Sequence, residues 1–224
     1  MKIQSILLAT AVATLVINCK EKTEQSTEIE TTVTDTVSGE TSHDMDHSDA
    51  EHEQSPIMAS MQKMMEKMHQ MEKTGNADYD LAASMKVHHQ GAIDMSSAEI
   101  NSGIDTKLKE MAQKMTKKQQ KEIKELEGIM SQSKGGAKNY DDNDHGLGKA
   151  MMDNMNSMMK MPEHAGSIDR DFAIMMVKHH KDGITMGQAI LKYAKNEKFK
   201  SMTEMMIADQ EKDIKELESW LASS

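Results

Sequence analysis

The chain is poor in cysteine, proline and aromatic residues: its 224 residues include one cysteine, two prolines and 3% aromatic residues. A single cysteine excludes a disulfide within one chain. Because proline interrupts helices, its scarcity leaves long stretches that can stay helical. An excess of positive charge is also missing, since the net charge is −10. Nucleic acid is therefore not an expected partner, whereas cations are.

The sequence also lacks an apolar run long enough to cross a bilayer comfortably. At the N-terminus, Lys2 precedes a mostly apolar segment, residues 3–17, which ends at Asn18 and Cys19. The residues before the cysteine resemble a lipobox, the sequence that directs lipid attachment. We therefore predict a lipoprotein signal peptide over residues 1–18 and lipidation of Cys19. The exported protein would be anchored to a membrane in the cell envelope, facing the periplasm or the cell surface.

Residues 19–55 have few large apolar side chains and many Thr, Ser, Glu and Asp residues. Such a segment cannot bury enough apolar surface to fold, so we predict a disordered acidic tether. Its stretch HDMDHSDAEHE contains His43, Met45, His47 and His52. Two interpretations stay open: a loose site for copper(II) or zinc, or an ordinary polar linker.

The remaining segment, residues 56–224, repeats itself at an offset of 91 residues. MKVHHQGAIDM in the first copy matches MVKHHKDGITM in the second, and KEIKELE matches KDIKELE. The pairs His88-His89 and His179-His180 therefore correspond. We predict a duplicated Met- and His-rich helical domain, with repeats at about 58–131 and 150–222.

The apolar pattern of each repeat predicts a helical hairpin. Helices are expected at roughly 78–102 and 104–131, and again at roughly 169–195 and 197–222, with Asp78 and Asp169 as helix N-caps. Within each first helix, apolar residues and the first histidine alternate at steps of four and three, which is the seam of a helical bundle. The fold class is therefore all-α, with four long helices and at least one histidine of each pair facing the interior.

Methionine is unusually abundant, with 25 residues. Many lie in two shorter helices that precede the hairpins. Thioether sulfur is a soft, uncharged ligand that suits copper(I) and silver(I), whereas imidazole binds both copper states and zinc. A methionine stripe alone is more often core packing, but the duplicated histidines favour a metal site. The predicted metal ligands are Met61, Met64, Met68, Met85, His88, His89, Met95, Met152, Met155, Met159, Met176, His179, His180 and Met186.

Acid should distinguish the two kinds of ligand. A histidine must be deprotonated to bind metal and has an unperturbed pKa of about 6.5, whereas a thioether has no proton to lose. We therefore expect mild acid to release copper(II) held by histidine more readily than copper(I) held by methionine.

Two HHxxxIxM motifs, beginning at His88 and His179, each precede a helix with the pattern Q-x-x-x-I-x-x-L. Over about residues 78–221 this arrangement resembles a family of domains of unknown function that includes CopM-type copper-binding proteins. The resemblance implies a ferritin-like four-helix bundle, export, copper binding and a contribution to copper tolerance. It places the family's ligands on both histidine pairs, on Met95 and Met186, and one turn earlier on Met85 and Met176.

Three other functions compete with an envelope protein that sequesters or buffers copper. A ferritin-like dimetal enzyme needs Glu-x-x-His motifs, but Met85 and Met176 occupy the position of the glutamate. A methionine-rich antioxidant would need exposed methionines, and an interaction lipoprotein would need no paired histidines. We therefore predict a protein that is not an enzyme, with copper as its ligand, silver or zinc as further candidates, and an efflux or delivery partner of unknown identity.

Overall fold

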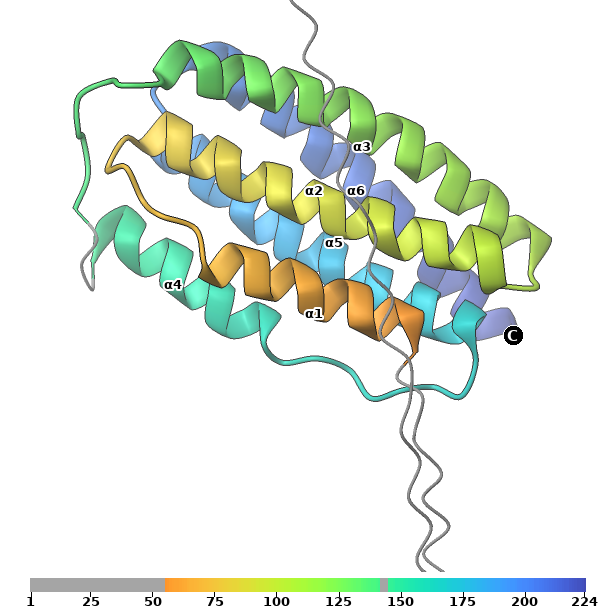
Figure 1. Cartoon of the computed structure of the whole chain (residues 1–224). Helices are drawn as coiled ribbons and strands as arrows, with labels where there is room; N and C mark the ends of the chain where they lie inside the picture. The colour runs from red at the N-terminus through yellow and green to blue at the C-terminus, as the bar shows by residue number, and fades with distance from the viewer. Residues whose placement is uncertain (1–54, 142–144) are drawn as a thin grey trace, which may run out of the picture. The chain divides into compact units, whose positions relative to one another are not determined.

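A computed structural model of the protein describes residues 55–141 and 145–224. The predicted signal peptide, Cys19 and the tether histidines lie outside these described residues. The described part consists of six helices without a strand, so the predicted all-α fold is confirmed (Figure 1). The helices are α1 (Pro56–His69), α2 (Ala77–Ser102), α3 (Thr106–Ser133), α4 (Gly146–Met158), α5 (Ile168–Tyr193) and α6 (Glu197–Ser223). None of these helices is long and apolar enough to span a membrane.

The four long helices form two hairpins that meet through α2 and α5. One hairpin is α2–α3 and the other is α5–α6, and the offset of 91 residues superimposes the first on the second in sequence. The start of α2 contacts the end of α5, and the start of α5 contacts the end of α2, so the two central helices are antiparallel. The short helix α1 packs on both α2 and α5, whereas α4 packs on α5 (Figure 1).

The predicted N-caps of α2 and α5 are wrong by two residues. Asn76 caps α2, because its side chain accepts a hydrogen bond from the Tyr79 backbone N–H, and Ser167 caps α5 in the same way. Asn and Ser are favoured caps because their side-chain oxygens satisfy a free N–H group of the first helical turn. Asp78 and Asp169 lie inside the helices, where each accepts hydrogen bonds from the other hairpin.

These two aspartates join the hairpins to each other. Asp78 Oδ1 accepts hydrogen bonds from the backbone N–H groups of Lys195 (2.7 Å) and of the residue after it, just before α6. Asp169 Oδ1 accepts the equivalent bonds from Ile104 (3.0 Å) and the following residue, just before α3. An aspartate of each repeat therefore fixes the turn between the two long helices of the other repeat. These two sets of hydrogen bonds act as clamps between the hairpins.

Methionine takes the place that leucine and aromatic residues usually occupy in a core. Both phenylalanines are fully buried, and much of the remaining volume is filled by thioether side chains. Flexible methionine fills irregular gaps, which suits a bundle with so few aromatic rings. The buried methionines are Met61, Met64, Met68, Met85, Met95, Met111, Met115, Met158, Met175, Met176, Met186, Met202 and Met206.

Helix α1 approaches α2 closely because Gly91 has no side chain. A Cβ atom at Gly91 would lie 2.5 Å from the sulfur and 3.0 Å from the Cβ of Met64. Distances below 3.0 Å do not occur between packed carbon atoms, so a larger residue at this position must push α1 away. The contact between Gly91 and Met64 therefore sets the distance between α1 and α2.

We expect Gly91→Leu to lower the free energy of unfolding by about 1–3 kcal/mol, because overpacking displaces α1. The matched control is Gly128→Leu on α3, where an added Cβ meets nothing within 4 Å. That change should be neutral or stabilise the protein by up to about 1 kcal/mol, since leucine favours helix more than glycine does. Denaturant unfolding of both variants measures the difference. Equal effects would mean that the close approach of α1 is unimportant.

Candidate metal site

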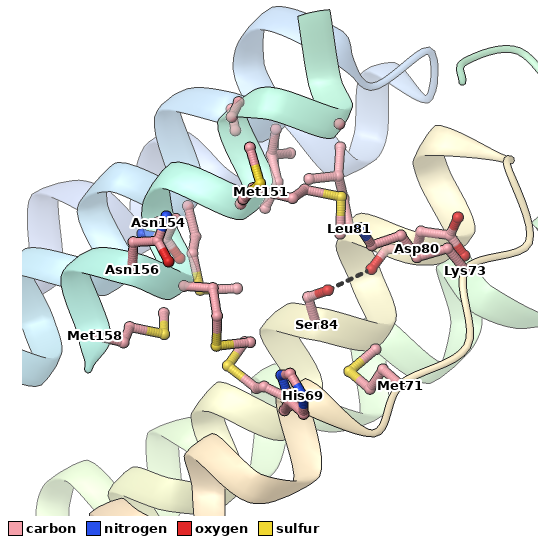
Figure 2. A pocket seen from close by; sticks show the side chains of 18 of the residues that line it. His69, Met71, Lys73, Asp80, Leu81, Ser84, Met151, Asn154, Asn156 and Met158 are labelled. Carbon is pink, nitrogen blue, oxygen red and sulfur yellow. Dashed lines mark hydrogen bonds between the residues drawn. The ribbon is translucent and has the colours of Figure 1, made fainter. Parts of the chain in front are cut away.

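The described residues line a partly open pocket of about 860 Å³ in which methionine is the most frequent residue. It lies between the end of α1, the start of α2, α4 and the end of α5 (Figure 2). Its apolar walls include Leu81 and Ile190, and His69 supplies an imidazole. Eight methionines line it: Met68, Met71, Met151, Met152, Met155, Met158, Met159 and Met186.

The pocket exists because α4 does not repeat the packing of α1. Asn154 is buried in α4 at the place where α1 has Met64, and Asp182 occupies the position that corresponds to Gly91. The Asn154 amide donates to the Asp182 backbone carbonyl at 3.3 Å, and the Ser157 hydroxyl donates to the Asp182 carboxylate at 3.3 Å. Lys178 pairs with the same carboxylate. Polar bonds thus hold α4 on α5, and a space remains between α4 and α2.

The register of α4 differs by one residue from the register predicted by the repeat. Helix α1 buries Ile57, Met61, Met64 and Met68, and α4 buries Leu147, Asn154 and Met158, with Met151 partly buried. The offset between these faces is 90 residues, because Met158 lies one residue further from the start of α5 than Met68 does from the start of α2.

This shift moves the three predicted ligands of α4 away from the buried face. Met152 is 47% exposed, Met159 is 60% exposed and Met155 is partly buried, so they do not occupy positions equivalent to Met61, Met64 and Met68. All three nevertheless line the pocket. The register therefore leaves these three predicted ligands where solvent and ions can reach them.

A buried carboxylate stabilises the rim of the pocket. Asp80, only 2% exposed, accepts hydrogen bonds from the Thr74 backbone N–H and hydroxyl, the Gly75 N–H and, at 2.7 Å, the Tyr140 hydroxyl. The Tyr140 oxygen also lies 3.9 Å from the Met151 sulfur. Since its oxygens already accept four hydrogen bonds, Asp80 is a structural residue that fixes the rim and is not a free ligand.

Thioethers are the most numerous donors of the pocket, which also contains Glu72, Ser84, Asn154 and Asn156. Nowhere in the described ranges do three or more His, Cys, Asp or Glu side chains come together in a way that could hold a metal ion. Hard cations such as magnesium and calcium need oxygen ligands, whereas thioethers select soft ions such as copper(I) and silver(I). The pocket is therefore chemically matched to soft monovalent ions.

All four paired histidines face the bundle interior, as the seam predicted for at least one of each pair. His88, His89, His179 and His180 are each 0% exposed. The rings of His88 and His179 stack with their centroids 3.6 Å apart, and a ring nitrogen of His179 lies 3.0 Å from the His88 backbone carbonyl oxygen. The stacked pair sits where the two repeats meet, so it lies at the centre of the duplication.

The second histidine of each pair faces a carboxylate of its own hairpin. His89 Nε2 lies 3.0 Å from Glu122 Oε2, and His180 Nε2 lies 3.7 Å from Asp213 Oδ2. Glu122 and Asp213 are again 91 positions apart. Both residues lie in the matching segments KEIKELE and KDIKELE, and neither was among the residues predicted from the sequence. The sequence signal that could have identified them is that each lies at the same sequence distance from the histidine pair of its own repeat.

Two glutamines complete this polar interior. Gln119 and Gln210 are buried and also correspond at the offset of 91. Both amide atoms of Gln210, the Gln119 oxygen and both ring nitrogens of His88 have no hydrogen-bond partner within the described part of the chain. Buried polar atoms are rarely left unsatisfied, so the interior of the bundle has unused capacity for water or an ion.

Burial changes the acid behaviour expected for the histidines. Loss of solvent lowers the pKa of His88 and His180 well below 6.5, and lowers the pKa of His179 to about 3. These rings stay neutral at mildly acidic pH in the folded protein. The expected release of copper(II) by protonation near pH 6.5 therefore loses its basis at these three residues.

The predicted ligands fall into separate groups in space. Of the predicted set, Met68, Met152, Met155, Met159 and Met186 line the pocket. Met61 and Met64 lie on the buried face of α1, and Met85, Met95 and Met176 lie in the core with the histidines. Four pocket donors were not among the predicted ligands: Met71, Met151 and Met158, which belong to the Met-rich segments, and the imidazole of His69. The only signal for His69 was its position at the end of a Met-rich helix.

The fold and the pocket define an all-helical protein of two repeated hairpins with a methionine-lined cavity. A family described as a domain of unknown function (DUF305) matches residues 11–130 and 78–221, and the chain belongs to this family. No curated protein matches the sequence significantly.

Solved structures of CopM share the fold. The structure titled CopM in the Cu(I)-bound form has a TM-score of 0.51 and 22% identity, covering 66% of this chain and 96% of that chain. A structure titled CopM in the Ag-bound form, obtained by soaking, has a TM-score of 0.50 and 23% identity, with coverage of 68% and 98%. At this level of identity the likeness concerns the arrangement of helices.

Proposed function

We propose that the protein binds copper(I) in the methionine pocket and thereby sequesters or buffers copper. The main support for this proposal is the pocket of about 860 Å³, whose lining includes eight methionines and His69. Copper(I) and silver(I) prefer such soft donors. The titles of the CopM structures, which name copper(I) and silver as bound ions, support the same assignment.

The four buried histidines are the second candidate in this proposal, for copper(II) or zinc, although their present arrangement does not form a metal site and their side chains must move to bind an ion. Imidazole suits both ions, and the unpartnered nitrogens of His88 support a ligand role. The carboxylates of Glu122 and Asp213 lie next to His89 and His180. Carboxylates in such positions orient histidines that bind metals. Ligation by His88 and His179 requires their stacked rings to separate, so we expect this site to be filled more slowly than the pocket.

A binding protein fits these residues better than a dimetal enzyme. Methionine three residues before each first histidine removes the carboxylate that oxidised iron needs. An antioxidant would present its methionines to solvent, yet many methionines in the described part are buried. A groove for a partner helix would not require the duplicated histidines and glutamines. We therefore propose a role in copper tolerance without catalysis.

The proposal includes a place in the cell envelope. The N-terminal signal and Cys19 support export and lipid anchoring. We expect Cys19→Ser to release the protein from membranes while the helical content measured by circular dichroism stays unchanged, because the anchor and the helices use separate segments. Membrane fractionation reports the first effect. Attachment of the variant equal to that of wild type would rule out the lipoprotein assignment.

Anaerobic titration of the full chain with copper(I) against a competing chelator tests the central proposal. Saturable binding with a dissociation constant at or below about 1 μM, or roughly 8 kcal/mol, is the expected result. Silver(I) should compete for the same capacity. A competition curve identical to that of the chelator alone would refute copper(I) binding.

A further inference from the structure

The methionine pocket is far larger than one metal ion requires. A water molecule takes about 30 Å³ in the liquid, and a bare copper ion needs no more room than that. The partly open pocket of about 860 Å³ leaves space beside a single ion. It therefore has room for more than one copper(I).

The number of donors leads to the same question. Soft metal sites in proteins use up to about four ligands, as in tetrahedral coordination. The pocket offers eight sulfurs and one imidazole. A single ion would leave at least half of these donors unused.

The donors come from separate walls. Helix α4 contributes five methionines, and Met152, Met155 and Met159 share one helical face because they are three, four and seven residues apart. The opposite group, Met68, His69 and Met71, comes from the end of α1 and the residues after it. Figure 2 shows Met71 and His69 on one side of the cavity and Met151 and Met158 on other walls.

We infer that the pocket holds at least two copper(I) ions at once, one on the α4 wall and one on the α1 wall. This inference rests on the proposed copper(I) function and makes the protein a store. Thioethers are neutral, so each ion keeps its positive charge, and the net charge of −10 favours accumulation of such ions. Glu72, on the same rim, supplies a nearby negative charge.

The difference between the repeats explains why the pocket forms beside α4. In the first repeat, α1 lies close against α2 at Gly91 and fills the groove with Met61 and Met64. In the second, Asn154 and Asp182 replace this packing by polar bonds. The methionines in the middle of α1 therefore pack against α2, whereas those of α4 line the pocket.

Native mass spectrometry of the full chain, loaded anaerobically with copper(I) and in parallel with silver(I), counts the ions. One variant removes the α4 wall by Met152→Leu, Met155→Leu and Met159→Leu, and the other removes the α1 wall by His69→Gln and Met71→Leu. Each variant should lose at least one ion and keep at least one. Met205→Leu, at an exposed position outside the pocket, is the control and should lose none.

The outcomes separate the inference from the proposed function. If wild type holds one pocket ion that either variant abolishes, the pocket is a single site, which overturns the inference and leaves the function standing. If both variants keep the full count, the ions lie elsewhere and the inference fails. Absence of any bound ion in wild type defeats the proposed function itself. Circular dichroism confirms that each variant retains its helices.

Discussion

The affinity of the α4 wall for copper(I) should fall by about a thousandfold or more, roughly 4 kcal/mol, when its five pocket methionines, four in α4 and Met159 at the C-cap, are replaced by leucine. The changes are Met151→Leu, Met152→Leu, Met155→Leu, Met158→Leu and Met159→Leu. Leucine has nearly the same volume as methionine, so packing is largely preserved while every sulfur of this wall is lost. Anaerobic competition against a chelator measures the affinity.

The control uses methionines that are buried but do not line the pocket. Met61→Leu and Met64→Leu lie on the buried face of α1 and should leave copper(I) affinity within about threefold of wild type, a difference below 1 kcal/mol. If this pair weakened binding as much as the α4 variant does, general loss of methionine would explain both results. The pocket would then have no special role.

A buried carboxyl group at the end of α2 should make stability depend strongly on pH. Glu99 is 0% exposed, and its carboxylate occupies the space where a Cβ of Gly103 would lie, at 2.3 Å. Burial, followed by the negative charge of Asp169, raises the pKa of Glu99 from 4.5 to about 8. Lys109 opposes this shift weakly and Asp105 adds to it. The raised pKa therefore keeps Glu99 protonated at neutral pH, beside the charge of Asp169.

The sign of the effect follows from proton counting. Above pH 4.5 the unfolded chain loses the Glu99 proton, whereas the folded protein keeps it until about pH 8. The free energy of unfolding therefore falls as pH rises through this interval, by about 1.4 kcal/mol per pH unit and on the order of 4 kcal/mol in total. Below pH 4.5 both states are protonated and the stability contribution is fully present.

Glu99→Gln should remove this dependence, because the amide has nearly the same shape as the carboxyl group and stays neutral at every pH in this range. We expect its melting temperature at pH 8 to exceed that of wild type by roughly 10 °C, with little difference at pH 4.5. Glu204→Gln, on the exposed surface of α6, is the matched control and should follow wild type. Parallel pH profiles for wild type and Glu99→Gln would disprove the role of Glu99.

Some residues were predictable because a pattern along one helix reveals its own buried face. The steps of four and three around His88 and His179 predicted that they point inward, and both are fully buried. The partners Glu122 and Asp213 were not predicted, since charged residues on a helix are usually solvated. Only the packing of α3 against α2, and of α6 against α5, brings these carboxylates to the histidines.

Helix α4 shows why a repeat does not always fix register. Its five methionines form two overlapping stripes, one starting at Met151 and one at Met152, and both fit a helical period. The sequence offset favoured the stripe of Met152, Met155 and Met159. The structure instead turns the stripe of Met151 and Met158 inward, because the polar bonds of Asp182 with Asn154 and Ser157 orient α4 on α5.

The sequence by itself determined the all-α class, the two hairpins and the inward histidines, because helical period and duplication are properties of the chain alone. Only the tertiary structure decided the pocket, the partners of the histidines, the clamps formed by Asp78 and Asp169, and the raised pKa of Glu99. Each of these depends on what lies opposite a side chain. That neighbour comes from a distant part of the chain, and its distance and burial are fixed only when the helices pack.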